Sequence, residues 1–88
     1  MERTVPIINR LGLHARAAAK LVTLASKFEA DVTIRKDGRE VSGKSIMGVL
    51  MLAAAKGSEI VLIANGSDAE QALAELTQLI ADRFGEED

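Results

Sequence analysis

Apolar residues recur along this 88-residue chain with two different periods, and the order in which the periods alternate restricts the fold. A period of two, or a dense apolar run, predicts strands at residues 4–9, 31–36, 39–42 and 59–64. Spacings of three and four predict helices at residues 16–27, 46–55 and from 69 to about 80. The order β-α-β-β-α-β-α favours an α/β two-layer, open-faced sandwich, with three helices covering one face of a four-stranded antiparallel sheet. Residues 1–88 are therefore expected to form a single domain.

Short local motifs mark where these elements turn, begin and end. Asp37-Gly38 predicts a tight hairpin between the second and third strands. Ser45 is predicted to cap the start of the second helix, with Gly57 as the glycine beyond its end. Ser67-x-x-Glu70 has the pattern of a capping box that opens the last helix.

The composition excludes several classes of chemistry. The chain has no cysteine and one histidine, His14, so disulfides, thiol catalysis, cysteine-based zinc sites and sites with two histidine ligands are excluded. We expect no metal and no cofactor. A net charge of −2 and two aromatic residues argue against nucleic-acid binding. The longest apolar run, Val49–Ala55, is too short to span a bilayer, and residues 1–6 contain no signal-peptide core, so a cytoplasmic protein without membrane insertion is expected. The acidic residues 85–88 are expected to be a solvated, frayed end.

His14 lies at the predicted start of the first long helix. Unpaired N–H groups and the helix dipole favour anions there, and the backbone of Ala15, Arg16 and Ala17 would supply the donors. The Arg16 side chain adds a fork that can bind phosphate oxygens, and Gly12 permits a tight turn while keeping bulk away from the ring. A histidine near a helix start can equally be an ordinary surface residue.

The same electrostatics oppose a positive charge on His14, so we expect its imidazole to be neutral and nucleophilic at neutral pH. One nucleophile, one arginine and several N–H donors suffice to relay a phosphoryl group. Hydrolysis would also need a base, and the sequence shows none near His14. A carrier that other enzymes use as a substrate is therefore favoured over a stand-alone enzyme.

The second helix is apolar nearly all round. If Val49, Leu52 and Ala53 point inward, the residues left exposed form a docking surface: Ile46, Met47, Leu50 and Met51. The alternative is a small helix buried on all sides. Ser45 can be a purely structural cap, or a modified serine whose phosphate would act on whatever docks beside it.

The residues of these motifs resemble those of the HPr family, the histidine phosphocarriers of the bacterial phosphoenolpyruvate-dependent phosphotransferase system. The resemblance extends over residues 4–83 and rests on three segments: Gly12-Leu13-His14-Ala15-Arg16, Gly43-Lys44-Ser45-Ile46-Met47-Gly48 and Ala55-Lys56-Gly57. It implies a sheet with the strand order 1-4-2-3.

The resemblance also implies partners and roles. His14 would accept a phosphoryl group on Nδ1 from phospho-enzyme I and pass it to a histidine of an enzyme IIA domain, while Arg16 would hold the phosphate. Ser45 matches a serine that an HPr kinase/phosphorylase modifies in many bacteria. The docking residues would include Lys20 on the first helix, and we expect a monomer.

One position departs from the family pattern, because Ala17 stands where proline is common after the arginine. Alanine keeps an N–H that could also face a phosphate. The segment with alanine is similar to the form found in some proteobacterial HPr proteins and in nitrogen-branch (NPr-type) carriers. A sugar-transporting enzyme II and a regulatory enzyme IIA therefore both stay open as downstream partners.

Two other functions compete with a phosphate relay. A regulatory binding module would control partners through Ser45 or through its phosphorylation state rather than through sugar uptake. An RNA-binding domain is disfavoured by the lack of strand aromatics and basic excess.

Overall fold

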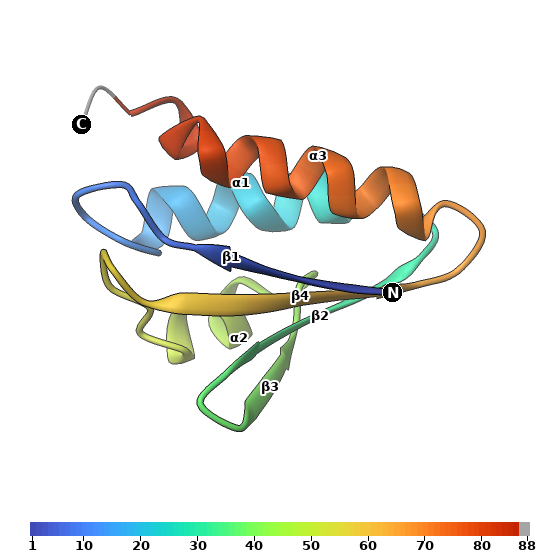
Figure 1. Ribbon diagram of the computed structural model, residues 1–88, viewed down its shortest axis with the longest axis horizontal. Helices are drawn as coiled ribbons and strands as arrows, with labels where there is room; N and C mark the ends of the chain where they lie inside the picture. Colours follow the sequence, from blue (N-terminus) through green and yellow to red (C-terminus); the bar gives the residue numbers. More distant parts are fainter. Residues whose placement is uncertain (87–88) are drawn as a thin grey trace.

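The computed structural model describes residues 1–86, in which four strands form one antiparallel sheet (Figure 1). Their order is β1-β4-β2-β3, which confirms the order that the resemblance implied. The strands are β1 Glu2–Pro6, β2 Asp31–Lys36, β3 Arg39–Ser42 and β4 Glu59–Asn65. The buried side chains of β4, at Ile60, Leu62 and Ala64, explain its central place, since the sheet is covered on that face.

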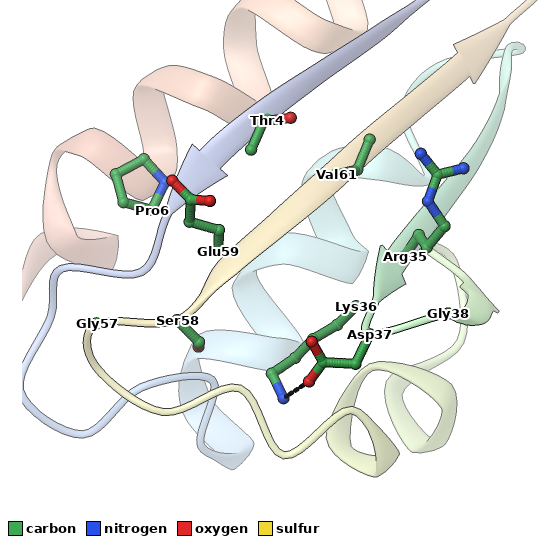
Figure 2. A pocket seen from close by; sticks show the side chains of 10 residues that line it. All are labelled: Thr4, Pro6, Arg35, Lys36, Asp37, Gly38, Gly57, Ser58, Glu59 and Val61. Carbon is green, nitrogen blue, oxygen red and sulfur yellow. Dashed lines mark hydrogen bonds and ion pairs between the residues drawn. The ribbon is translucent and has the colours of Figure 1, made fainter.

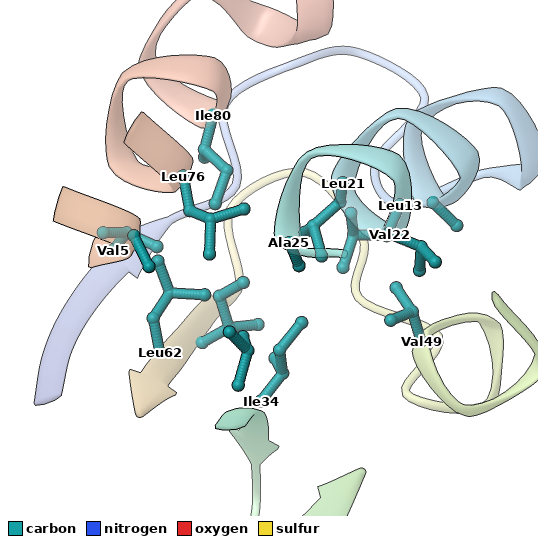
Figure 3. Packing of buried hydrophobic residues seen from close by; sticks show 14 of the residues in the cluster. Val5, Leu13, Leu21, Val22, Ala25, Ile34, Val49, Leu62, Leu76 and Ile80 are labelled. Carbon is teal, nitrogen blue, oxygen red and sulfur yellow. The ribbon is translucent and has the colours of Figure 1, made fainter. Parts of the chain in front are cut away.

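Three helices lie on one side of the sheet, as predicted, and a short 3-10 turn follows the last of them. They are α1 Ala15–Ala25, α2 Ile46–Met51, α3 Ala69–Ala81 and the turn η1 Arg83–Gly85. Figure 3 shows Leu21 of α1 and Leu76 of α3 packed over Ile34 and Leu62 of the sheet. The core is almost entirely aliphatic, and the buried Phe84 joins it from η1. Within residues 1–86, no helix is long and apolar enough to cross a membrane.

The first strand begins and ends earlier than the predicted residues 4–9. Glu2 and Arg3 pair with Ile63 and Leu62 through their backbones, which their polar side chains do not reveal. Beyond Pro6 the chain still exchanges hydrogen bonds with residues 57 and 58, but these belong to a turn rather than to a strand.

The second helix is shorter than the predicted residues 46–55, because the chain leaves the helical conformation at Ala53, whose φ is +50°. Leu52, not Gly57, is therefore the capping residue at its end. Ala53 is exposed rather than inward, whereas Val49 and Leu52 are buried as predicted.

The predicted capping box at the start of α3 is wrong. Asp68, not Ser67, occupies the cap position, and its carboxylate reaches across to accept hydrogen bonds from the N–H groups of Glu29 and Ala30, at 2.9 and 2.8 Å. These bonds hold the pKa of Asp68 below its usual value.

Helix α1 begins one residue earlier and ends two residues earlier than predicted.

Candidate functional site

His14 is the capping residue at the start of α1, and its backbone is extended, with φ −71° and ψ 177°. Its side chain is 27% exposed and forms no capping bond to the helix. The loop before it is fixed by a hydrogen bond from the Leu13 N–H to the Ala54 carbonyl, at 2.9 Å. Gly12 has the left-handed φ of +67°, and a Cβ there would lie 2.5 Å from the Ala54 oxygen. The glycine is therefore needed for the close approach of residues 54 and 55.

The first turn of α1 contains backbone donors without helical acceptors. The Ala18 N–H bonds to the His14 carbonyl at 2.8 Å, so the N–H groups of Ala15, Arg16 and Ala17 have no carbonyl four residues before them in the helix. Arg16 is exposed, and within residues 1–86 its guanidinium forms no ion pair. Ala17 is buried, and because alanine, unlike proline, has a backbone N–H, it supplies the third donor. This helix start therefore brings together an imidazole, an exposed guanidinium and three backbone donors.

A carboxylate that the sequence did not indicate lies against the imidazole. Oε2 of Glu86 contacts Nε2 of His14, and Oε1 of Glu86 accepts a hydrogen bond from Nδ2 of Asn9 at 3.1 Å. The Glu86 side chain is only 17% exposed, so the expectation of a solvated, frayed end is wrong at this residue; Glu87 and Asp88 lie outside the described residues. The bonds from His14 and Asn9 outweigh burial and lower the pKa of Glu86.

Glu86 also corrects the expectation that no base lies near His14. Both of its oxygens already accept hydrogen bonds, so it is not presented to a water molecule in the way that hydrolysis would need. It adds negative charge where the sequence suggested only positive charge. The one sequence signal for its position was Phe84, a large apolar residue in an otherwise polar end.

Ser45 caps α2 as predicted, because its Oγ accepts a hydrogen bond from the Gly48 N–H at 3.0 Å. Next to it, three of the four predicted docking residues of this helix are exposed: Ile46 at 43%, Met47 at 68% and Met51 at 60%. Leu50 differs, since it is half-buried against the core. The helix is thus not buried on all sides, and its exposed residues are all apolar.

Two further residues refine this surface. Leu11, in the loop before His14, is 60% exposed and was not predicted to belong to it. Lys20 is exposed, but its Nζ donates to the Phe84 carbonyl at 2.6 Å, so it is tied to the C-terminal segment. Lys20 lines a groove between α1 and α3 together with Arg16 and Lys27.

A second hollow lies on the uncovered face of the sheet, away from His14 (Figure 2). Three of its charged side chains form ion pairs: Arg35 pairs with Glu2 and Glu40, and Lys36 pairs with Asp37. None of the predicted site residues lines it. Within the described part of the chain, no three histidine, aspartate or glutamate side chains converge in a group that could hold a metal ion.

Comparison with known families identifies this arrangement. The family model described as "PTS HPr component phosphorylation site" matches residues 1–82. The chain belongs to the HPr family. HPr proteins are phosphocarriers of the phosphotransferase system and not stand-alone enzymes, in agreement with the sequence-based expectation.

Relatives in bacteria support the assignment along nearly the whole chain. A phosphocarrier protein HPr of Cupriavidus necator is 52% identical over 98% of this chain and 97% of its own length. A phosphocarrier protein NPr of Shewanella violacea is 45% identical over 98% of this chain and 94% of its own.

Solved HPr structures support the fold. The crystal structure of HPr-C-His from Thermoanaerobacter tengcongensis superimposes with a TM-score of 0.96, at 44% identity, and covers 100% of this chain and 99% of that one. A crystal structure described as an HPr dimer from the same organism has a TM-score of 0.80 at 44% identity, and covers 98% of this chain and 99% of that one.

Proposed function

We propose that this chain accepts a phosphoryl group on Nδ1 of His14 from phospho-enzyme I and passes it to a histidine of an enzyme IIA domain. The observation that carries the proposal is the start of α1, where the half-buried imidazole lies beside three uncommitted N–H groups and the exposed Arg16. In each transfer the nitrogen lone pair forms a bond to phosphorus, while the bond from phosphorus to the donor breaks and its electron pair stays with the donor.

The helix start would stabilise the phosphoryl oxygens in both directions. Backbone N–H groups and a guanidinium are suited to the charge that spreads over these oxygens during transfer. Because the imidazole is partly exposed and Arg16 is exposed, a docked partner can supply the second half of the reaction centre. Ile46, Met47 and Met51, with Leu11 and the half-buried Leu50, are proposed as the contact surface for both partners, and Lys20 as its edge.

Enzyme I and phosphoenolpyruvate provide the direct test. The wild type is expected to gain one acid-labile phosphoryl group by intact-mass spectrometry, and His14→Ala none. Arg3→Ala, at an exposed arginine of β1, is the matched control for loss of a side chain and should react like the wild type. Equal labelling of His14→Ala and wild type would refute the assignment.

Ser45 is proposed as a regulatory phosphorylation site for an HPr kinase/phosphorylase. Its position at the start of α2 would put a phosphate beside Ile46 and Met47, and so inside the docking surface. Ser45→Asp is expected to raise the KM of enzyme I for the carrier, whereas Ser45→Ala is not. A KM that is the same for both variants would contradict the role.

A second candidate is favoured by the NPr relative and by Ala17. In it the chain belongs to a nitrogen-branch system and controls partner proteins through its phosphorylation state. Transfer from the phosphorylated chain to sugar-type and nitrogen-type enzyme IIA proteins, measured side by side, distinguishes the two.

We expect the chain to act as a monomer, which sedimentation at working concentration tests; a stable dimer would contradict it.

A further inference from the structure

At the candidate site, the C-terminal segment lies beside the loop that carries His14. Residues 14 and 86 are 72 positions apart, yet a Glu86 oxygen contacts the imidazole. Figure 1 shows the C-terminal segment and the loop between β1 and α1 at the same end of the molecule. The contact therefore depends on tertiary structure and not on neighbouring sequence.

Several contacts hold Glu86 in this place. Phe84 is 1% exposed in the core, and its carbonyl accepts the Lys20 ammonium at 2.6 Å. The backbone turns sharply through Arg83, Phe84 and Gly85, whose φ values are +56°, +56° and +78°. This turn directs the next residue away from α3 and towards α1.

Asn9 supports the carboxylate from the other side. It is completely buried, and its Nδ2 donates to the Gly12 carbonyl at 2.8 Å and to Oε1 of Glu86 at 3.1 Å. One amide group thus joins the loop that carries His14 to the carboxylate that faces it. Buried polar groups are as a rule hydrogen-bonded, and the Nδ2 of Asn9 donates both of its hydrogen bonds to this loop and to Glu86.

The charge of Glu86 determines what Nε2 can do. An ionised carboxylate accepts hydrogen bonds and donates none, so Nε2 must carry the proton. A neutral imidazole has one ring proton, and Nδ1 is then left with its lone pair. A carboxylate that fixes the tautomer of a reactive histidine is known from other histidine sites.

We propose that Glu86 is a positioning residue for phosphoryl transfer, which keeps the proton of His14 on Nε2 and leaves Nδ1 as the attacking atom. The inference rests on the proposed function of His14. In the transfer, the Nδ1 lone pair forms the bond to phosphorus, the proton stays on Nε2, and the donor keeps the electron pair of the bond that breaks. The ring then carries positive charge, which the Glu86 carboxylate stabilises.

Two variants separate this role from a merely structural one. Glu86→Ala removes the acceptor, and Glu86→Gln keeps its shape but replaces it with an amide that can donate as well as accept. Glu59→Gln, at an exposed glutamate of β4, is the matched control for loss of one charge. All are first compared by circular dichroism and thermal unfolding, so that a folding defect is recognised.

The first measurement needs no partner protein. With the wild-type ring in its neutral form, 15N NMR should show Nε2 as the protonated nitrogen and Nδ1 as the unprotonated one. In both Glu86 variants the two nitrogen shifts should move towards each other as the tautomers exchange. In Glu59→Gln they should not move.

The second measurement is the rate of phosphorylation by enzyme I. We expect kcat to fall roughly tenfold in both Glu86 variants, with KM for the carrier little changed, because docking uses other residues. Unchanged tautomers, or an unchanged kcat, in folded variants overturns the inference, and so does an effect on KM alone. If the wild type itself is not phosphorylated on His14, the proposed function fails, whereas a reactive wild type with equally reactive variants refutes only the role of Glu86.

Discussion

The starts of α1 and α2 use the same backbone geometry in opposite ways. At α2, the Ser45 hydroxyl accepts the Gly48 N–H, so a helix of six residues is capped by its own chain. At α1, His14 occupies the same position with an extended backbone but provides no cap, and three N–H groups remain uncommitted. The difference shows that an uncapped helix start, which reduces stability, keeps donors available for an anion.

The start of α3 is a third case. Its Asp68 carboxylate bonds to the N–H groups of Glu29 and Ala30 instead of to its own helix. It therefore joins α3 to the turn that leads into β2. The N–H groups at the start of α1 are thus left open, the start of α2 is capped by its own side chain, and the capping residue of α3 bonds to a neighbouring segment.

The largest effect that would test this comparison is on the rate of phosphoryl transfer. Arg16→Ala is expected to slow phosphorylation by enzyme I about 10–100-fold, because a hydrogen bond to a charged group contributes about 1.5–3 kcal/mol. Single-turnover kinetics at saturating enzyme I measure it, with Arg3→Ala as the control. An equal rate for Arg16→Ala would mean that the donors of α1 are sufficient without the guanidinium.

The next effect concerns the stability that Asp68 contributes. Because its pKa is lowered in the folded chain, the ionised form stabilises the fold above the pKa of the unfolded chain, and this stabilisation is lost as pH falls through the folded pKa. Asp68→Ala should therefore unfold at a lower temperature than wild type at pH 7, and the difference between the two unfolding temperatures should shrink as pH falls through the acidic range in which aspartates are protonated. Asp31→Ala, at an exposed aspartate, should show no such gap; a gap for Asp68→Ala that is constant with pH would contradict the prediction.

A smaller effect is expected from placing a cap at the start of α1. His14→Ser and His14→Ala both lose the Glu86 contact and the nucleophile, but only serine can accept an N–H of the first turn. His14→Ser should be more stable than His14→Ala by about 1 kcal/mol in urea unfolding, while neither accepts a phosphoryl group. Equal stability would show that the donors of α1 are not available to a capping oxygen.

The smallest effect is expected at Ala17. Ala17→Pro removes an N–H that has no helical acceptor and restricts the unfolded chain, so it should stabilise the fold by about 0.4–1 kcal/mol. Phosphorylation should slow less than tenfold, since two donors and Arg16 remain. A destabilised variant would show that the buried environment of Ala17 has no room for the ring.

Periodicity and turn chemistry predicted the element order, the hairpin at Asp37-Gly38, the cap at Ser45 and the buried faces of α1 and α3, because these depend on residues close in sequence. The strand order did not follow from periodicity, and the family resemblance supplied it. The wrong predictions involve distant partners: Ala53 leaves the helix where residues 52–55 close on the His14 loop, and Asp68 bonds to residues 29 and 30.

The candidate site shows the same division. His14, Arg16 and the first turn of α1 are adjacent in sequence, so their association could be predicted. Glu86 could not, because its position follows from the burial of Phe84 and from a reversal of the backbone through three residues of positive φ. The acidic composition of the chain end suggested solvation, and only the tertiary structure shows a hydrogen-bonded carboxylate.

The contact between residues 14 and 86 also makes the imidazole a reporter of the order in which the chain assembles. The loop and first turn of α1 need only residues 9–18 and the segment around Ala54, whereas the carboxylate reaches the ring only when α3 has docked and Phe84 is buried. The ring nitrogen signals should therefore reach their native positions with the last tertiary contacts to form, later than the helical signal of α1. A single spectroscopic probe at His14 would then report when the last tertiary contacts of the molecule form during folding.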